Sequence, residues 1–447
     1  MKASVKIFLV TLALFALAVL LFHDRKSVSV ARSENRLEIY YMYNENESQA
    51  DWFNAACDEF KTAFADKYPG IEIDVLYAGR EVLGKLRPRM IIGNPPDIVN
   101  QGGDQLEPLI RAGLLEPLDE VLSLPAYDQD MPWRDTFIDG VFDIYAYEGH
   151  DYFIPTSLFC SVFFYDKVMF ERLHITPPVT WEEFLSVCQT LKENGIEPIA
   201  ADGTEIGYNI AWYAYAISRT TTVEHVLATA WNEPGTSWDE PCYVEGAEMV
   251  RLLRDKGYIM KGYEGSKWPS AQMNWVQGKC GLLYTGTWIP KEMKNALPDA
   301  FKMGIFRAPI LESHPDGDSY AQDIGAECFA IPKGARHREA AIDFLRFITS
   351  KKQADILADM DVPSAIKGCR MPEALIGLDT YLSPPYKLIE GMAGIGSDLS
   401  EWYRIVPRNY WSDLFLGHIG PEEMCKEVEQ AHLRYYERMK AIGGEPR

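Results

Sequence analysis

The stretch from residue 37 to residue 77, LEIYYMYNENESQADWFNAACDEFKTAFADKYPGIEIDVLY, decides the fold class. Apolar residues alternate with other residues over 37–43 and again over 71–77, which is the spacing of β-strands with one face turned to a core. Between these two strands, apolar residues recur at helical spacing over 53–63, and Tyr68-Pro69-Gly70 ends the helix. Strand, helix and strand within about 40 residues predict a parallel α/β sheet.

The same alternation of elements continues along the chain. Short apolar segments bounded by turn residues predict further strands, and helical spacing predicts further helices. The expected strands cover 97–99, 281–284 and 327–331, and the expected helices include 341–348 and 424–435. Because the sequence contains no short-period repeat and no low-complexity linker, we expect one compact α/β body with two lobes.

Two positions predict where helices begin. Ser48 is followed three residues later by Asp51, and Thr180 is followed by Glu183 at the same spacing. This is the spacing of a capping box, in which two side chains satisfy backbone N–H groups of the first helical turn. We therefore expect a side-chain cap at both places.

Composition limits the classes of partner. The chain has 447 residues, which suits about three domains or two large lobes. It carries 44 Lys and Arg against 65 Asp and Glu, a net charge of -21. Such a charge repels phosphate backbones, and no basic run offsets it, so no nucleic-acid partner is expected.

The N-terminus predicts export. Lys2 and Lys6 precede an apolar run at 7–22, the pattern of an export signal. Residues 1–31 are therefore predicted to be either a signal peptide, cut after Ser29-Val30-Ala31, or a retained membrane anchor. Either way the protein is expected in the periplasm or on the outer face of the cytoplasmic membrane.

Catalytic and metal-binding signatures are missing from the sequence. It contains no G-x-S-x-G elbow, phosphate-binding glycine loop, G-x-G-x-x-G or H-E-x-x-H. The eight cysteines form no C-x-x-C, so they are either buried small residues or partners in disulfides that spacing cannot assign. We therefore predict no catalytic residue, no metal site and no cofactor.

Several segments resemble the bacterial extracellular solute-binding protein family 1, the maltose-binding-like receptors of ABC importers. Their order and spacing along the chain carry the resemblance more than any single segment does. The segments are 94–99 (NPPDIV), 152–156 (YFIPT), 163–167 (FFYDK), 177–184 (PPVTWEEF), 278–288 (GKCGLLYTGTW) and 329–334 (FAIPKG).

The resemblance implies a two-lobed periplasmic-binding-protein fold, with a ligand cleft between α/β lobes joined by crossing hinge strands. By this analogy lobe 1 comprises 37–158 and 325–362, and lobe 2 comprises 159–324 and 363–447. The crossings are expected near 156–164, 325–331 and 362–365. Ligand binding would close the lobes, and the closed form would dock on an ABC permease in the cytoplasmic membrane.

Candidate ligand-binding residues combine hydrogen-bonding groups with flat aromatic rings. Sugars present hydroxyls and weakly apolar ring faces, so a sugar site needs both. Asn44, Glu45 and Glu47 follow the first strand, at the sheet edge where open α/β sheets bind ligands. By resemblance Asp104 faces the cleft and Trp288 is a stacking ring. The remaining candidates are Thr156, Ser157, Tyr208, Asn209, Trp212, Trp275, Trp402 and Arg404.

The predicted function is capture of a mono- or oligosaccharide by a monomeric, non-catalytic receptor that delivers it to the permease. Arg404 is the only basic residue among the candidates, so an anionic ligand would lack an obvious counter-charge. Two alternatives stay open at this point. The receptor could present its closed form to a membrane sensor, or the chain could be an exported carbohydrate-active hydrolase.

Overall fold

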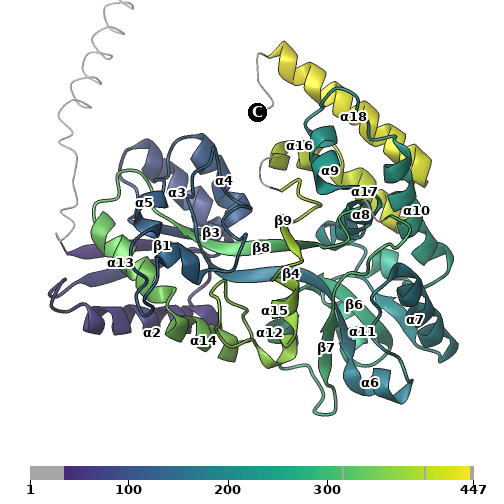
Figure 1. Ribbon diagram of the computed structural model, residues 1–447, viewed down its shortest axis with the longest axis horizontal. Helices are drawn as coiled ribbons and strands as arrows, with labels where there is room; N and C mark the ends of the chain where they lie inside the picture. The colour runs from purple at the N-terminus through teal and green to yellow at the C-terminus, as the bar shows by residue number, and fades with distance from the viewer. Residues whose placement is uncertain (1–34, 315–316, 397–398, 443–447) are drawn as a thin grey trace, which may run out of the picture.

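A computed structural model describes residues 35–314, 317–396 and 399–442 of the chain. The predicted signal or anchor, residues 1–31, lies outside this described part. Two long strands, β4 (Ile154–Asp166) and β8 (Ala321–Ala330), run across the middle of the molecule and join two lobes (Figure 1). The whole sheet has the strand order β2-β1-β3-β8-β4-β6-β5, with β7 beside β4 and β9 beside β8.

Lobe 1 is built on the N-terminal strands. β1 pairs in parallel with both β2 and β3, and β3 pairs antiparallel with β8. Its strands are β1 (Arg36–Tyr41), β2 (Glu72–Tyr77) and β3 (Ile98–Gly102). Its helices are α2 (Ser48–Ala63), α3 (Val82–Ile91), α4 (Gly103–Arg111), α5 (Asp119–Leu122), α13 (Arg338–Ile348) and α14 (Lys351–Asp359), with 3-10 turns at Gly79–Glu81 and Trp133–Thr136.

Lobe 2 contains the other strands and most of the helices. Its strands are β5 (Glu197–Ala200), β6 (Cys280–Gly286), β7 (Met303–Phe306) and β9 (Lys387–Glu390). Its helices are α6 (Lys167–Arg172), α7 (Trp181–Glu193), α8 (Ile206–Thr220), α9 (Val223–Ala230), α10 (Pro241–Asp255), α11 (Ser270–Val276), α12 (Ile289–Met293), α15 (Leu378–Tyr381), α16 (Ser400–Ile405), α17 (Arg408–Leu416) and α18 (Pro421–Ala441), with 3-10 turns at Tyr263–Gly265 and Glu373–Leu375. The long helix α18 runs along the outer side of this lobe (Figure 1).

Each crossing strand pairs with elements of both lobes. The first half of β4 pairs with β8, and its second half pairs with β6 and β7. β8 pairs with β3 at one end and with β9 at the other. A third segment lies against β4, because the N–H of Leu158 donates to the carbonyl of Pro363 (2.9 Å) and the N–H of Ala365 donates to that of Thr156 (3.0 Å).

The elements predicted from the opening stretch are confirmed. β1, α2 and β2 lie where alternation and helical spacing place them, and the two strands pair in parallel. The predicted box at Thr180 is confirmed, with both reciprocal hydrogen bonds to Glu183. The predicted box at Ser48 is wrong: Ser48 is already inside α2, Glu47 is the N-cap, and no side chain caps this end. The three-residue spacing of Ser48 and Asp51 therefore misplaced the first helical residue by one position.

Aromatic rings fill the cores of both lobes. In lobe 1, Phe53 of α2 stacks on Tyr41 of β1 with ring centroids 4.1 Å apart. In lobe 2, Phe163 of β4 stacks on Tyr284 of β6 (4.6 Å) and on Phe306 of β7 (5.0 Å). All of these rings are buried, so the hydrophobic effect ties the helices and outer strands of each lobe to its crossing strands.

A buried carboxylate connects three segments of lobe 1. Asp97, immediately before β3, is completely buried and accepts four hydrogen bonds. One comes from the N–H of Glu38 in β1 (2.9 Å), and two come from the N–H groups of Arg336 and His337 just before α13 (both 2.9 Å). The fourth joins Asp97 Oδ2 to His337 Nδ1 (3.1 Å). One side chain therefore fixes β1 and the start of α13 relative to β3.

All eight cysteines lie in the described ranges, and none forms a disulfide there. Six of them are buried, which agrees with the interpretation of these residues as small apolar core groups. Among the helices of the described part, none is both long enough and apolar enough to span a bilayer.

Candidate functional site

The ends of strands from both lobes converge on a short piece of the crossing strands. Gly102, the last residue of β3, pairs with Glu327 of β8, and Glu327 pairs with Ser157 of β4. Gly286, the last residue of β6, pairs with Ser161 of β4. The two meeting points on β4, Ser157 and Ser161, are four positions apart, about 13 Å of strand. Because ligands of open α/β sheets bind beyond the carboxyl ends of the strands, this stretch is the floor of the candidate site.

Glu327 is the centre of the polar cluster at the lobe 1 end of this floor. Its side chain is almost completely buried. Oε2 accepts hydrogen bonds from the Tyr43 hydroxyl (2.9 Å) and the Ser157 hydroxyl (3.1 Å), and Oε1 accepts one from Asn100 Nδ2 (3.1 Å). Burial raises the pKa of the Glu327 carboxyl, while these three hydrogen bonds and the charge of Lys291 oppose the rise. The cluster thereby ties the ends of β1 and β3 to both crossing strands.

Lys291 brings lobe 2 to the same cluster. It belongs to α12, directly after β6, and its Nζ lies 5.7 Å from the centre of the Tyr43 ring, a cation–π geometry. Burial lowers the pKa of Lys291, while the nearby carboxylates of Glu47 and Glu327 favour its charged form. The ammonium group of Lys291 in lobe 2 therefore lies near the carboxylates of Glu47 and Glu327 and the ring of Tyr43 on the lobe 1 side.

Trp288 stands over the middle of the floor. It lies at the N-cap of α12, is 40% exposed, and packs edge-on against Phe159 of β4 with ring centroids 6.3 Å apart. The ring lies directly over Gly286, where a Cβ would come within 1.9 Å of it. Glycine at this position therefore lets the indole lie flat against the strand end while part of the ring stays open to solvent.

Two further aromatic side chains lie on the lobe 2 side of the junction. Tyr208, near the start of α8, is half-buried and lies close to the side chains of Trp288 and Thr285. Burial first, and then the charge of Glu292, raises the pKa of Tyr208. Trp268 is 51% exposed and its Nε1 donates to Glu292 Oε1 (2.6 Å). The lobe 2 side of the junction is therefore an aromatic surface with a carboxylate and a hydroxyl within it, which suits a ligand with apolar faces and hydroxyls.

The acidic and amide candidates lie on the lobe 1 side. Asn44 and Glu45 are exposed after β1, and Glu47 accepts hydrogen bonds from the backbone N–H and Nδ2 of Asn44 (both 2.8 Å). Asp104 is exposed in the first turn of α4. These groups follow β1 and β3, the two strands whose carboxyl ends reach the floor.

Several predicted residues have structural partners instead of solvent. Ser157 donates to Glu327, and Thr156 Oγ1 donates to the Glu327 carbonyl (3.2 Å), so both connect the crossing strands. Asn209 Nδ2 donates to the Gly203 carbonyl (2.8 Å) and to Ser412 Oγ (3.0 Å). All three side chains are buried.

Three predicted tryptophans lie in the core of lobe 2, each at most 3% exposed. Trp212 packs against Phe163, and Trp275 packs against Phe164. Trp402 stacks on another buried indole and donates from Nε1 to His432 Nδ1 (3.0 Å). Arg404, two residues later on α16, is exposed. Ligand contact by the buried tryptophans stays a prediction, and none of them reaches the surface in this conformation.

Sequence reasoning missed Glu327, Lys291, Phe159 and Trp268. For Glu327 a signal existed, because an acid within the apolar segment at 327–331 is rarely buried without partners. For Lys291 and Trp268 there was none, since ordinary surface positions of short helices and loops have the same pattern.

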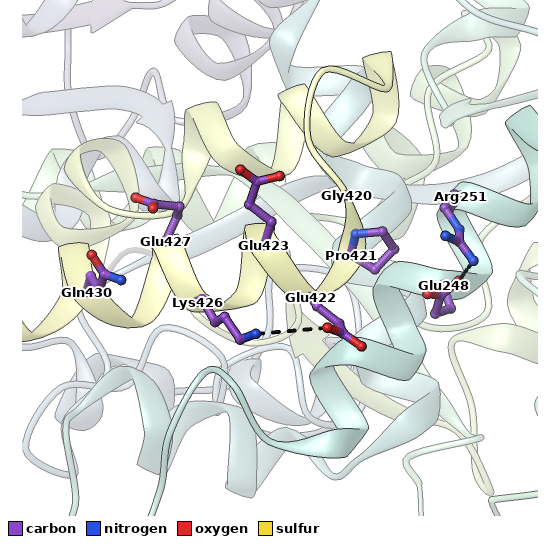
Figure 2. A pocket seen from close by; sticks show the side chains of 9 residues that line it. All are labelled: Glu248, Arg251, Gly420, Pro421, Glu422, Glu423, Lys426, Glu427 and Gln430. Carbon is purple, nitrogen blue, oxygen red and sulfur yellow. Dashed lines mark ion pairs between the residues drawn. The ribbon is translucent and has the colours of Figure 1, made fainter.

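A separate surface hollow lies at the start of α18 and does not fit the same chemistry. Figure 2 shows that charged side chains of α10 and α18 surround it, with Arg251 paired to Glu248 at 2.5 Å. Its lining contains no aromatic ring, so it offers nothing to stack on a sugar. The residues that line it are Glu248, Arg251, Gly420, Pro421, Glu422, Glu423, Lys426, Glu427 and Gln430.

The sequence match to a known protein family shows how this chain is related to other proteins. Residues 46–355 match the family described as bacterial extracellular solute-binding protein. The chain belongs to this family. The match begins after β1, contains β2 to β8 and ends within α14, so this solute-binding protein resembles the family in both lobes and both crossing strands.

Known relatives agree with this assignment. The diacetylchitobiose binding protein NgcE of Streptomyces coelicolor is 26% identical over 302 residues, which cover 64% of this chain but only 62% of NgcE. Among solved structures, a chitin oligosaccharide binding protein superposes with a TM-score of 0.68 at 18% identity, over 90% of this chain and 99% of that one. The apo-form of RafE from Streptococcus pneumoniae gives a TM-score of 0.73 at 18% identity, over 90% and 98%. These structures share the two-lobed fold of this solute-binding protein.

Proposed function

We propose that this solute-binding protein captures a carbohydrate at the junction of its lobes and delivers it to an ABC permease. The observation that carries the proposal is Trp288, a partly exposed indole held flat over Gly286 at the floor between the lobes. Sugars stack on such rings through their C–H faces. The names of the relatives support the same ligand class, because NgcE is a diacetylchitobiose binding protein and a structural neighbour binds chitin oligosaccharide.

The two sides of the junction have complementary roles in this proposal. The aromatic surface around Trp288 and Tyr208 supports a sugar ring, while Glu292 accepts hydrogen bonds from hydroxyls. Across the floor, Asn44, Glu45 and Asp104 hold the opposite edge of the ring with carboxylate and amide oxygens. Carboxylates are acceptors only, so they match the hydroxyl donors of a neutral sugar and repel an anion.

Hinge closure is the proposed mechanism of capture. The lobes would be 37–158 with 325–362 and 159–324 with 363–447, turning about β4, β8 and the segment at 362–365. Thr156 connects these three segments. Its Oγ1 donates to the carbonyl of Glu327 in β8, and its own carbonyl accepts a hydrogen bond from the N–H of Ala365. Motion concentrated there would bring Lys291 and Trp288 toward the lobe 1 acids without disturbing either core.

The proposed setting is extracytoplasmic, as the family's description states for its members. Residues 7–22 would either direct export or anchor the protein to the outer face of the membrane. We propose that it works as a monomer which presents its closed form to the permease.

A thermal-unfolding screen tests the ligand class. The purified protein is heated with mono- and oligosaccharides, starting with diacetylchitobiose and chitin oligosaccharides, and with amino acids and polyamines for comparison. A ligand at one hundred times its dissociation constant adds about 2.7 kcal/mol to the free energy of unfolding, which raises Tm by a few degrees. Response to a sugar that is recovered unchanged supports a receptor. Consumption of the sugar supports a hydrolase, and a response only to another ligand class refutes the carbohydrate assignment.

Substitution at Trp288 tests the site. Trp288→Ala should weaken sugar binding about five- to a hundredfold, because a stacking ring contributes roughly 1–3 kcal/mol, and should leave Tm without ligand nearly unchanged. Trp288→Phe, which keeps a flat ring, is the matched control and should retain most of the affinity. Trp275→Ala should instead lower Tm without ligand, because that buried ring packs in the core of lobe 2. Unchanged binding in Trp288→Ala would move the site elsewhere.

A further inference from the structure

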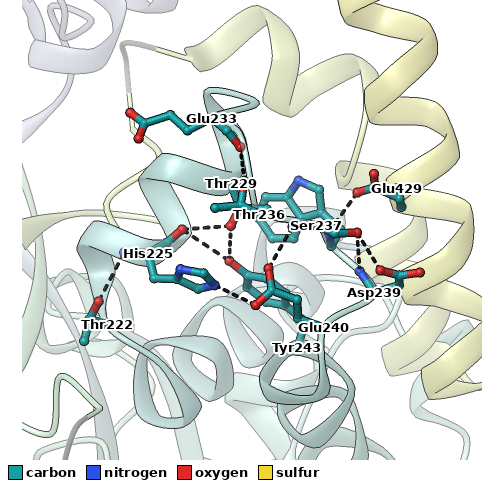
Figure 3. Close-up of polar contacts among 11 residues, drawn as sticks. Thr222, His225, Thr229, Glu233, Thr236, Ser237, Asp239, Glu240, Tyr243 and Glu429 are labelled. Carbon is teal, nitrogen blue, oxygen red and sulfur yellow. Dashed lines mark hydrogen bonds and ion pairs between the residues drawn. The ribbon is translucent and has the colours of Figure 1, made fainter.

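Three metal-ligating side chains meet in lobe 2, away from the floor of the candidate site. They are His225 of α9 with Glu240 and Cys242 at the start of α10, and their ligand atoms all lie within 4.8 Å of one another. Within the described ranges no other group of His, Cys, Asp or Glu meets this criterion. Figure 3 shows the His225 ring and the Glu240 carboxylate pointing toward each other between the two helices.

His225 and Glu240 are each oriented by a second contact. His225 Nε2 lies 3.1 Å from Glu240 Oε2, and the other carboxylate oxygen accepts a hydrogen bond from the N–H of Ser237 (2.7 Å). The imidazole stacks on the ring of Tyr243, with centroids 5.9 Å apart and planes 13° from parallel. Tyr243 is itself held by a 2.7 Å hydrogen bond to Thr229 Oγ1. Such outer contacts fix ligand orientation in metal sites.

The backbone supplies the spacing of the set. Glu240 is the N-cap of α10, Pro241 is its first residue and Cys242 the second, so the carboxylate and the thiol both lie at the same helix start. His225 lies in the first turn of α9, whose N-cap Thr222 accepts from the His225 N–H (3.1 Å). Two well-formed helix starts therefore hold all three ligands.

We propose that His225, Glu240 and Cys242 form a zinc-binding site. A nitrogen, a carboxylate oxygen and a sulfur are the donors of protein zinc sites, and tetrahedral coordination separates its ligands by about 3.3–3.8 Å. The His225–Glu240 pair already has nearly this separation (3.1 Å), and the sulfur of Cys242 lies within 4.8 Å of both other ligand atoms. The sulfur favours zinc over calcium or magnesium, which take oxygen ligands.

Three protein ligands leave one tetrahedral position for water. The side chains of His225 and Glu240 are 30% and 31% exposed, so solvent zinc and water reach them. Burial, followed by the charge of Glu240, raises the pKa of the Cys242 thiol. The bound ion would connect α9 to α10 more firmly than the His225–Glu240 contact alone.

Metal titration of the intact protein tests the site. After treatment with a chelator, the protein is titrated with Zn²⁺ by calorimetry, and with Co²⁺ to follow the charge-transfer absorption of a cobalt–thiolate bond. We expect one ion per chain, a rise in Tm with zinc, and the thiolate absorption with cobalt. Cys242→Ser, His225→Gln and Glu240→Gln should each lower zinc affinity at least tenfold, and Cys242→Ser should abolish the absorption.

Matched controls come from the same chain. Cys369 is another half-buried cysteine, whose Sγ donates to the carbonyl of Ile366, so Cys369→Ser should leave the cobalt spectrum unchanged. His418 is an exposed histidine paired with Asp413 (3.1 Å), so His418→Gln should leave zinc affinity unchanged. Circular dichroism without metal verifies that each variant is folded. No zinc binding by the parent, or binding unaffected by Cys242→Ser and His225→Gln, would overturn the proposal.

Discussion

Asp97→Asn should destabilise lobe 1, although it only replaces one carboxylate oxygen by an NH₂ group of similar size. The carboxylate of Asp97 is fully buried and its two oxygens receive four hydrogen bonds, two at Oδ1 from Arg336 and His337 and two at Oδ2 from Glu38 and the His337 ring. An amide has one acceptor oxygen, so two of the four donors must face an NH₂ group.

The magnitude follows from the best arrangement the amide can adopt. If the oxygen keeps the two backbone N–H groups before α13, the NH₂ group faces Glu38 N and the ring of His337. The ring can change tautomer and accept, but the N–H of Glu38 cannot, which leaves one buried donor unsatisfied at about 1–3 kcal/mol. The two retained bonds lose their charged acceptor at about 1 kcal/mol each. The expected loss is therefore about 3–5 kcal/mol of the 5–15 kcal/mol typical of a folded protein.

Urea unfolding followed by circular dichroism measures this loss. The matched control is Asp104→Asn, the same change at an exposed position in the first turn of α4, where Oδ2 accepts only from the neighbouring Gln105 (2.6 Å). That variant should stay within about 0.5 kcal/mol of the parent. If the free energy of unfolding of Asp97→Asn is as close to that of the parent as the value for Asp104→Asn, the hydrogen bonds of Asp97 to the segments around β1 and α13 do not stabilise lobe 1 as argued.

Three further changes have defined outcomes. Burial lowers the pKa of His432 to about 4, so protons bind the unfolded state first and stability falls as pH drops from about 6.5 to about 4. Between those two pH values, the free energy of unfolding of the parent, measured with urea, should fall by about 3 kcal/mol more than that of His432→Gln. If the free energies of the two proteins change in parallel with pH, this prediction is contradicted. Thr180→Ala removes the acceptor for the Glu183 N–H (3.2 Å) and should cost about 1 kcal/mol in urea unfolding, whereas no change would mean the cap is redundant. Phe163→Ala empties a fully buried position between two stacked rings and should cost about 3–5 kcal/mol by the same measurement; less than about 1 kcal/mol would show that the core collapses around it.

Much of the fold could be predicted because it depends on local pattern. Alternation over 37–43 and 71–77 defined β1 and β2, and the box at Thr180 defined the start of α7. The same local reasoning failed at Ser48, where spacing alone could not show that the helix begins one residue earlier. The segment at 94–99 was recognised by its resemblance, and the structure supplies a physical reason for its aspartate, which holds three elements together.

The candidate site was less predictable because exposure depends on distant parts of the chain. Trp288 and Trp275 are the same residue type, yet one is 40% exposed and the other 1%. Phe164 and Phe301, far from Trp275 in sequence, bury its ring. Periodicity describes one element at a time and cannot show which other elements cover it.

The sequence by itself determined the order of strands and helices, the absence of known catalytic motifs and the family resemblance, since each depends on residues close together in the chain. Only the tertiary structure decided which side chains reach the junction. It brought Glu327 to Tyr43 and Lys291 to the opposite lobe, residues separated by hundreds of positions. Their proximity follows from the pairing of β3 and β4 with β8 and of β6 with β4, and hydrogen bonds between distant strands leave no periodic trace in sequence.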